Sequence, residues 1–348
     1  MQLIYINGYC LSQKFSGIQR FAQNIIEHLD KLNSTHQNPL QMICLVPREV
    51  ETSFSSIQVK VLKTGFSFID NKQILWEQLL LPFRTKSNYL INLCNFAPIF
   101  KKNQLVVIHD VIPFRYPKIC SRLWGGFFRF MTNIFVKRVK HLASVSHFSA
   151  EEILAVTHSN REIIVLGNSG EHFNSIAADS EVLNRLNITP GSYILSVSSQ
   201  AHAAHKNFVT LANVANVVHL PVIAVGAGCD NIQNIQYTGQ INDQELKALY
   251  ENAFVFVFPS LYEGFGIPPL EAFVCGAPVL VSDIEIFHEV CGNAALYFDP
   301  ASYKDIVNKV TRLQQDASLR KELINKGREQ ALIYRWDTIT CQVFNLLI

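Results

Sequence analysis

The chain has 348 residues, a hydrophobic content of 49% and a formal net charge of +2. This length exceeds the usual size of a single domain, and the apolar content suffices for two cores, so we expect two domains. The near balance of charge argues against bulk nucleic-acid binding as the main role, and no nucleic-acid partner is expected.

The first residues, MQLIYINGYC, are predicted to form a β-strand rather than an export signal. They lack a basic segment followed by an uninterrupted apolar core. No apolar run in the chain reaches the roughly 18 residues that a membrane span needs. The eight cysteines are scattered without a C-x-x-C pair, which favours buried free thiols over disulfides or structural zinc. We therefore predict a cytoplasmic protein.

Short apolar runs alternate with segments of helical period along the whole chain. This alternation is typical of α/β folds, in which helices cover both faces of a parallel sheet. A polar stretch broken by Gly and Pro, 167–191, lies between the two halves and is the predicted hinge. The predicted strands are 3–6, 42–46, 59–62, 89–93 and 105–108 in the first half, and 193–197, 222–225, 254–258, 278–281 and 295–298 in the second.

A glycine opens the first predicted helix, in the segment KFSGIQRFAQNII. The apolar residues Ile18, Phe21 and Ile25 recur three and four positions apart, which indicates a helix with one buried face. Gly17 allows two interpretations. Either it lets the backbone approach a ligand closely, or it follows Ser16 in an ordinary helix cap.

The segment VVIHDVIPFRYP places His109 and Asp110 directly after the predicted strand 105–108. In an open α/β sheet, ligands collect beyond the carboxyl ends of the strands, so polar residues at this position are candidates for chemistry. His109 is a candidate hydrogen-bond donor or general base, with Asp110 orienting its ring. The alternative is a histidine held by local backbone, with Asp110 capping a turn.

A helix is predicted over 122–140, with basic and aromatic residues on separate faces. Such a helix either lies on a membrane surface or covers a sheet with its apolar face. The first interpretation makes the inner face of the membrane a partner of a peripherally attached protein. The polar face carries Arg122, Arg129, Asn133, Lys137 and Lys140, and the apolar face carries Trp124, Phe128, Met131, Phe135 and Val139.

Lys206 and Asn207 follow the first strand of the second half through the turn SSQAHAAHKN. A lysine here is a point charge suited to a pyrophosphate, although a lone lysine is more often simply solvated. The later segment YTGQINDQELKALYENA predicts a turn around Gly239 and a cap at Asn242 or Asp243. An amphipathic helix follows this cap.

The segment FPSLYEGFGIPPLEAFVCGAP carries the strongest signal for function. A buried strand ends at Phe258, Gly264 and Gly266 leave the turn bare, and two prolines suit the first turn of a helix. Backbone N–H groups at such a helix start bind anions, and Glu263 and Glu271 accept hydrogen bonds from hydroxyl groups. A nucleoside diphosphate sugar offers both phosphate and hydroxyl groups. On spacing alone, two glutamates eight positions apart carry little weight.

With its surroundings, this segment resembles the E-x7-E signature of retaining glycosyltransferases of the GT-B fold, specifically family 4. The HD pair resembles the family element on the acceptor side of the active site. The serine-glycine-isoleucine loop near the N-terminus resembles the loop over the donor phosphates. This chain differs from the family pattern at His205, because members of the family usually have an arginine before the lysine that corresponds to Lys206. It covers nearly the whole chain and is strongest over 193–300.

The resemblance implies an α/β fold of two Rossmann-like domains whose parallel sheets face each other across a cleft. The terminal segment is expected to cross back as a helix and to pack on the first domain, with Trp336 as an anchor. The implied divisions are an acceptor-side domain at 1–168, a hinge at 169–191, a nucleotide-sugar-binding domain at 192–333 and the terminal helix at 334–348.

The resemblance also implies retaining, metal-independent transfer of a hexose-type sugar from a nucleoside diphosphate sugar to a glycan or lipid-linked acceptor. Cell-surface polysaccharide or lipopolysaccharide biosynthesis is the expected setting. No Asp-x-Asp motif is present, and we expect no metal and no cofactor besides the co-substrate. Two alternatives stay open: a sugar-nucleotide epimerase on the same fold, and a non-catalytic scaffold subunit of a polysaccharide assembly complex.

Within the implied site, Lys206 would steady the diphosphate, Glu271 would bind ribose hydroxyls and Glu263 would bind sugar hydroxyls. His205 would replace the usual arginine, either protonated or as a neutral donor. Such a contact would weaken donor binding as the pH rises, and a flat pH dependence of donor affinity between pH 6 and 8 would count against it. The expected catalytic residues are His109, Asp110 and Glu263, and the expected donor-binding residues are Gly17, His205, Lys206, Asn207, Gly239, Glu263, Gly264, Phe265, Gly266, Ile267 and Glu271.

Overall fold

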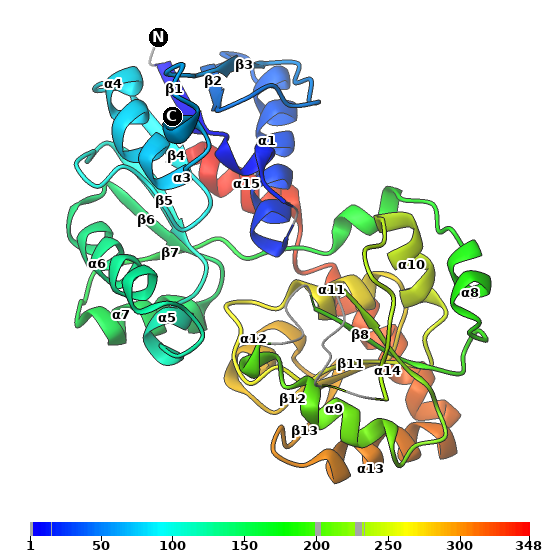
Figure 1. The fold of residues 1–348 in the computed structure, drawn as a ribbon. Helices are drawn as coiled ribbons and strands as arrows, with labels where there is room; N and C mark the ends of the chain where they lie inside the picture. Colours follow the sequence, from blue (N-terminus) through cyan, green and yellow to red (C-terminus); the bar gives the residue numbers. More distant parts are fainter. Residues whose placement is uncertain (1–2, 15, 199–202, 227–231, 233) are drawn as a thin grey trace. The chain divides into compact units, whose positions relative to one another are not determined.

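The protein was analysed as a computed structural model that describes residues 3–14, 16–198, 203–226, 232 and 234–348. The chain divides into two compact units, which we call unit 1 and unit 2 (Figure 1). Unit 1 comprises Met1–Asn168 and Trp336–Ile348, and unit 2 comprises Ser169–Arg335. Each unit has its own parallel sheet and its own helices.

Unit 1 is built on a parallel sheet of seven strands in the order β3-β2-β1-β4-β5-β6-β7. Every residue of β4 and β5 is buried, whereas β3 at the sheet edge is partly exposed. Central parallel strands are covered on both faces, so their sequences are mostly apolar; the buried Asn92 and Gln104 are the polar residues of these two strands. The strands are β1 (Leu3–Asn7), β2 (Gln41–Val46), β3 (Ile57–Val61), β4 (Tyr89–Asn92), β5 (Gln104–Ile108), β6 (His141–Ser144) and β7 (Ile164–Val165).

The register of the central strands places β1 between β2 and β4. Ile4 is opposite Met42 of β2 on one side and Tyr89 of β4 on the other. The helices of unit 1 are α1 (Gly17–Thr35), α2 (Ser67–Asp70), α3 (Gln73–Leu75), α4 (Leu81–Thr85), α5 (Ile112–Arg115), α6 (Arg122–Arg138), α7 (His147–Thr157) and α15 (Trp336–Asn345), with a 3-10 turn η1 (Tyr9–Ser12) and a π-helical turn η2 (Trp76–Leu80).

The last helix, α15, belongs to unit 1 although all of unit 2 precedes it in the chain. It packs along α1, and in Figure 1 the red helix lies beside the blue one. Trp336 is fully buried, with its ring 6.0 Å from that of Phe21, and Phe344 lies 5.1 Å from the ring of His36. Trp336 is therefore a packing anchor of unit 1.

Unit 2 is built on a parallel sheet of six strands in the order β10-β9-β8-β11-β12-β13. The strand order reverses between β8 and β11, which are neighbours in the sheet. Such a switch point leaves a crevice beyond the carboxyl ends of the two strands. The strands are β8 (Ile194–Val197), β9 (Val222–Val225), β10 (Gln236–Tyr237), β11 (Val255–Phe258), β12 (Val279–Ser282) and β13 (Ala295–Phe298).

Residues 169–191, predicted as a hinge, are part of unit 2 and carry structure of their own. Asp179 N donates to the carbonyl of Gln244, and α8 packs on α10. Gly and Pro mark turns in a sequence but do not reveal that the segment between them packs. The helices of unit 2 are α8 (Glu181–Leu186), α9 (Phe208–Ala215), α10 (Asp243–Glu251), α11 (Ile267–Val274), α12 (Glu285–Cys291), α13 (Tyr303–Gln315) and α14 (Ala317–Ala331), with 3-10 turns η3 (Glu171–Ser175) and η4 (Ala204–Lys206).

The structure confirms the predicted α/β class, with one parallel sheet in each half. All the predicted strands occur, within two residues of the expected bounds at either end. Three further strands, β6, β7 and β10, were not predicted. They are short, and β6 has the sequence HLAS, so none of them stands out as an apolar run.

The predicted basic and aromatic helix is α6, and it ends at Arg138. Its predicted apolar face mostly packs inside unit 1, because Phe128, Met131 and Phe135 are buried. The buried side chains of that face are therefore not available to a membrane surface. The exposed apolar residues of α6 are instead Leu123, Phe130 and, in part, Trp124.

Two further observations concern the described residues only. None of their helices is both long and apolar enough to cross a membrane. Seven of the cysteines are free thiols, but burial is not general: Cys10, Cys44 and Cys291 are buried, whereas Cys341 is exposed. Cys229 lies outside the described residues.

Candidate functional site

The candidate site of unit 2 lies at the switch point of its sheet. His205 and Lys206 follow β8, and the turn from Glu263 to Ile267 follows β11. Residues 199–202, in the turn between β8 and η4, lie outside the described residues. The topology therefore brings two of the predicted motifs to one edge of one sheet.

Lys206 and Glu263 form an ion pair. The Lys206 Nζ atom lies 2.5 Å from Glu263 Oε1, and both side chains are mostly buried. The ammonium also lies 5.9 Å from the centre of the Phe258 ring. An ammonium has three N–H donors, so the pair leaves two of them for other acceptors such as phosphate oxygens. The carboxylate fixes the position of the cation.

The turn between Glu263 and α11 requires a glycine at position 266. Its φ angle is +88°, in the left-handed region, and a Cβ atom there would lie 2.8 Å from the Phe287 ring. Pro268 and Pro269 follow in the first turn of α11 and carry no N–H group. Backbone donors at this helix start therefore come from the glycine-bearing turn itself, where Phe265 and Ile267 are buried.

Glu271 is buried on α11 and is held by two side chains that the sequence did not single out. The Tyr250 hydroxyl donates to its Oε2 at 2.9 Å, and His172 Nε2 lies 3.3 Å from its Oε1. Tyr250 comes from α10 and His172 from η3, which lies inside the predicted hinge. Because a carboxylate accepts about four hydrogen bonds, these partners leave capacity for ligand hydroxyls.

Gly170 explains how η3 comes so close to α11. A Cβ atom at this position would lie 2.7 Å from the backbone nitrogen of Glu271. No other residue therefore fits there without shifting the helix. The glycine brings His172 to Glu271 across about a hundred residues of sequence, and a pattern within one segment carries no signal for such a contact.

The surroundings of His205 favour the neutral form of its ring. Burial, and next the neighbouring Lys206, lower the pKa of its imidazole to about 4, against the opposite effect of Glu263. This pKa favours the neutral-donor form of the expected contact, and donor binding by His205 stays a prediction. Its backbone carbonyl accepts from Leu261 N at 2.7 Å, which ties the β8 turn to the β11 turn.

Asn207 and Gly239 have structural roles in unit 2. Asn207 adopts a left-handed backbone before α9, and its side chain bonds the carbonyl of Pro300 and the hydroxyl of Thr210. Gly239 has a φ of +70° and forms an isolated bridge with Gly226. The cap of α10, left open between two residues, is Asn242 in a capping box. Donor binding by Asn207 and Gly239 stays a prediction.

In unit 1, His109 lies inside the core. Its Nε2 bonds the carbonyl of Leu93 at 2.7 Å, and the Phe21 ring packs edge-on against it at 4.9 Å. A carbonyl only accepts, so Nε2 carries the proton and Nδ1 is the basic atom. Burial lowers the pKa of the ring to about 4, although the bond to Leu93 raises it. A neutral, weakly basic ring fits the local-backbone interpretation better than general-base catalysis.

Asp110 does not orient this ring. Its Oδ1 accepts from Ile112 N at 2.9 Å and so caps the turn into α5. Within the described part of the chain, the His109 ring has no bond to Asp110. Gly17 begins α1 as predicted and is preceded by Ser16 in extended conformation. The Ser16 hydroxyl bonds the Gln19 side chain rather than a backbone N–H group.

The ranges that the structure describes contain no group of three or more His, Cys, Asp or Glu side chains that could hold a metal ion. The donor set of unit 2 consists instead of one ammonium, two carboxylates, a phenol and a turn of backbone amides. Such a set suits a ligand that combines anionic and hydroxyl groups.

Comparison with known proteins gives a consistent result for the sequence. A family profile described as Glycosyl transferases group 1 matches residues 227–330. The O-antigen chain mannosyltransferase RfbU of Salmonella typhimurium is 31% identical over 262 residues, which cover 71% of this chain and 69% of that protein. Other mannosyltransferases from Escherichia coli also match, over less than a third of their own length.

Solved structures share the fold. Sucrose-phosphate synthase from Thermosynechococcus elongatus superimposes with a TM-score of 0.74 at 16% identity, covering 100% of this chain and 98% of that one. HepE from Anabaena, solved in complex with UDP and glucose, superimposes with a TM-score of 0.73 at 14% identity, covering 100% and 99%. These likenesses confirm the predicted GT-B fold class and, at such identities, carry nothing beyond the fold.

Proposed function

This chain belongs to the group 1 glycosyltransferases, and on that premise we propose that it transfers a mannosyl group from a nucleoside diphosphate mannose. The choice of mannose rests on the names of the relatives. The acceptor in this proposal is a glycan or a lipid-linked glycan of O-antigen or another cell-surface polysaccharide. Transfer with retention, without a metal and within family 4 are parts of the same proposal.

One observation supports the donor site most strongly: the switch point of unit 2 gathers the Lys206–Glu263 pair and Glu271 at one sheet edge. In the proposal, Lys206 and the amides of the turn at 264–266 bind the diphosphate. Glu271, held by Tyr250, binds the ribose hydroxyls, and Glu263 binds the sugar hydroxyls.

In the proposed reaction, the bond between the sugar C1 and the diphosphate oxygen breaks. A bond from C1 to the acceptor oxygen forms on the same face, and the acceptor proton passes to the departing diphosphate. Cations and amides that are already in place stabilise the charge that develops on the leaving group. We assign no proton transfer to His109, because its imidazole is a weak base.

We also propose a peripheral contact with the inner face of the membrane through α6. The exposed residues of this helix that support the contact are Arg122, Leu123, Phe130 and Lys137. Basic and apolar side chains together suit an anionic lipid surface. Sedimentation with anionic vesicles at low salt, reversed by high salt, is expected; a protein that never sediments with the vesicles contradicts this contact.

A panel of nucleotide sugars tests the donor. Thermal shift should select one nucleoside diphosphate sugar, and the full-length protein should then hydrolyse it slowly and transfer its sugar in the presence of an acceptor. Formation of the same product in excess chelator supports transfer without a metal. Formation of an α-linked product from an α-linked donor supports transfer with retention. An epimer formed without acceptor would indicate the epimerase, and binding without any turnover would indicate the scaffold.

A further inference from the structure

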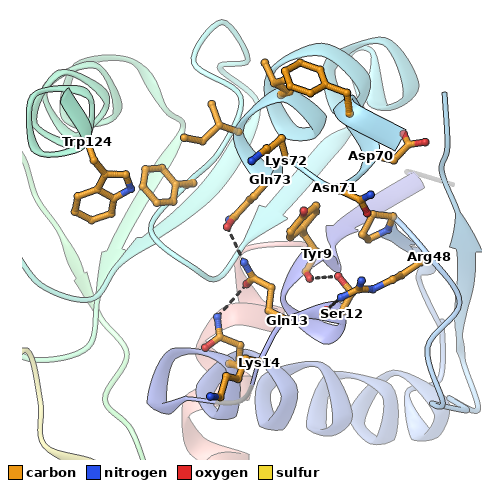
Figure 2. Close-up of a pocket in the computed structure, with 16 residues that line it drawn as sticks. Tyr9, Ser12, Gln13, Lys14, Arg48, Asp70, Asn71, Lys72, Gln73 and Trp124 are labelled. Atoms are coloured by element: carbon orange, nitrogen blue, oxygen red, sulfur yellow. Dashed lines mark hydrogen bonds between the residues drawn. The ribbon is translucent and has the colours of Figure 1, made fainter. Parts of the chain in front are cut away.

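Each unit has a polar site at the carboxyl ends of its strands, and in unit 1 the amides of this site pair with one another. They line a pocket beyond β1, β2 and β4 (Figure 2). Gln73 Oε1 accepts from Gln13 Nε2 at 2.8 Å, and Gln13 Oε1 accepts from Gln19 Nε2 at 2.9 Å. Gln73 Nε2 in turn donates to the buried Glu77 at 2.9 Å. These side chains therefore find their partners within the protein.

The site of unit 2 contains a buried ring that is not paired in this way. The His172 side chain is 9% exposed, and both of its ring nitrogens are buried without a hydrogen-bond partner among the described residues. The Nε2 atom lies 3.3 Å from Glu271 Oε1, but the two groups are not aligned for a hydrogen bond. Buried polar groups in native proteins almost always have a partner. The unpaired ring beside this carboxylate therefore points to a function.

Neighbouring residues of unit 2 fix the position of this ring. Lys247 Nζ donates to the carbonyls of Phe173 at 2.9 Å and of Ile176 at 2.7 Å, which ties η3 to α10. The Phe173 ring contacts the ring of His172 at 4.6 Å and that of Tyr250 at 5.8 Å. Several interactions thus place an imidazole that makes no hydrogen bond of its own within the described residues.

Tyr250 contacts the other oxygen of the same carboxylate. Its side chain is fully buried, and its hydroxyl donates to Glu271 Oε2 at 2.9 Å. One hydrogen bond leaves the plane of a glutamate carboxylate loosely defined, because the last torsion of this side chain has broad minima. A second donor at Oε1 defines the plane. The imidazole of His172 lies where such a donor is needed.

The plane of this carboxylate matters for a ligand with two adjacent hydroxyl groups, such as a ribose. A carboxylate accepts from both hydroxyls only when each of its oxygens faces one of them. A site built in this way rejects an analogue that lacks the hydroxyls, because its own polar groups then stay unpaired. Control of the rotation of Glu271 is therefore control of the selectivity for ribose.

We infer that His172 and Tyr250 are positioning residues that make the site selective for a ribonucleotide over a deoxyribonucleotide. Selectivity of this kind rests on the proposed function, in which Glu271 binds the ribose hydroxyls. When these hydroxyls bind, the carboxylate turns until the Nε2–H group of His172 donates to Oε1, while Tyr250 keeps its bond to Oε2. Nε2 carries the proton because a carboxylate only accepts. The ring then gains the partner that it lacks within the described residues.

Calorimetric titration of the full-length protein with GDP, UDP, ADP and CDP tests the inference. The nucleotide that binds most tightly is then compared with its 2′,3′-dideoxy form, which lacks both hydroxyls. The ratio of the two affinities is measured on one preparation, so any loss of folded protein in a variant cancels. Hydrogen bonds to a charged group are strong, so we expect a ratio of about a hundred or more for the parent.

Tyr250→Phe and His172→Leu should each lower this ratio about tenfold. His172→Gln should keep the ratio within about twofold, because its amide donates from nearly the position of Nε2. The matched controls are His219→Gln, at an exposed histidine of unit 2, and Tyr303→Phe, at a tyrosine of unit 2 outside the site. Both controls should keep the ratio of the parent.

An unchanged ratio in Tyr250→Phe or His172→Leu overturns the inference, even where both nucleotides bind more weakly, since equal weakening indicates a structural role alone. A lowered ratio in His172→Gln or in a control, or a parent that does not distinguish the two nucleotides, also overturns it. The expected ratios without turnover of any nucleotide sugar remove the proposed function and leave the inference. Sugar transfer with unchanged ratios does the reverse, and a parent that binds none of the nucleotides removes both.

Discussion

The candidate sites of the two units lie at equivalent edges of their sheets. The side chains that form the two sites differ. In unit 2 the charged groups already have partners, Lys206 with Glu263 and Glu271 with Tyr250. In unit 1 the ammonium groups of Lys14 and Lys72 have no partner among the described residues, and the ordered part is a chain of neutral amides from Gln13, Gln19 and Gln73. Strand order thus decides where each site lies, while the residues after the strands decide its chemistry.

This difference predicts different responses to substitution. A paired, buried charge holds its geometry without ligand, and removing one partner leaves the other charge unsatisfied. An exposed lysine without a partner contributes to binding but little to the fold. Substitutions in unit 2 should therefore affect binding and structure together, whereas the lysines of unit 1 should affect binding alone.

The largest effect is expected for Glu271→Gln. The change removes the charge that Tyr250 and His172 contact and that, in the proposal, binds two ribose hydroxyls. Hydrogen bonds to charged groups contribute about 1.5 to 3 kcal/mol each, so donor affinity should fall roughly a thousandfold. Titration with the nucleotide sugar selected by thermal shift measures this. Glu285→Gln, at an exposed position of the same unit, should bind like the parent; undiminished donor binding by Glu271→Gln would falsify the assigned site.

The next effect concerns the stability of unit 1. Burial raises the pKa of Glu77 to about 7 from 4.5, although bonds from Gln73 and Asn7 lower it. The folded state therefore holds the proton more tightly, and the stability that this group contributes below pH 4.5 is lost as the pH rises through 7. Between pH 4 and 8 the parent should lose about 3 kcal/mol of unfolding free energy through this group. Glu77→Gln should lack this loss.

Urea unfolding at several pH values measures the difference between the two proteins. Glu49→Gln, at an exposed carboxyl of unit 1, is the matched control and should follow the parent. Parallel stability profiles for the parent and Glu77→Gln would contradict the prediction. They would show that the carboxyl ionises in the folded state as readily as in water.

A smaller effect is expected for Lys206→Met. It removes the ammonium that the proposal places on the diphosphate and leaves Glu263 beside it without a cation. We expect about 2 kcal/mol less donor binding, or a thirtyfold loss. Lys304→Met, at an exposed lysine of unit 2, is the control. If Lys206→Met and the double variant Lys206→Met/Glu263→Gln bind donor equally and as well as the parent, the ion pair has no part in donor binding.

The smallest effect is expected at His205. Because the pKa of its ring is about 4, the ring gains no charge between pH 6 and 8. Donor affinity of the parent and of His205→Gln should therefore change with pH in parallel over this range, to within about twofold. A drop in affinity with a midpoint near pH 6.5, present in the parent and absent in the variant, would restore the protonated clamp.

Most of the fold could be predicted because buried parallel strands appear in the sequence as short apolar runs. The strand Gln104–Ile108 is buried on both faces, and its apolar run from Leu105 onward stands out from the helices around it. The strand His141–Ser144 does not stand out, because it is short and contains polar residues. Its place in the sheet follows from its neighbours, and these are not visible in its own sequence.

The candidate site of unit 2 could be predicted only in part, for a related reason. The types and spacing of Lys206, Glu263 and Glu271 pointed to a donor site, but the contact of Lys206 with Glu263 spans 57 positions. His172 lay in a segment predicted as a hinge. Such partners are set by the tertiary fold, and one sequence without a structure does not reveal them.

The pocket of unit 1 left no signal at all in the sequence. Its glutamines come from three separate places, and a glutamine in a turn or a helix start suggests only a solvated surface. Their function as a chain depends on Glu77, which looks from the sequence like one charge on an amphipathic helix. A polar network becomes recognisable only when its members are brought together.

The position of α15 also has a consequence for the order of synthesis. The helix that buries Trp336 against α1 leaves the ribosome only after all of unit 2 has been translated. During that time Phe21 has no indole to pack against, although every strand of the first sheet already exists. Unit 1 is begun first and completed last, and its final packing waits for a helix encoded beyond the neighbouring unit.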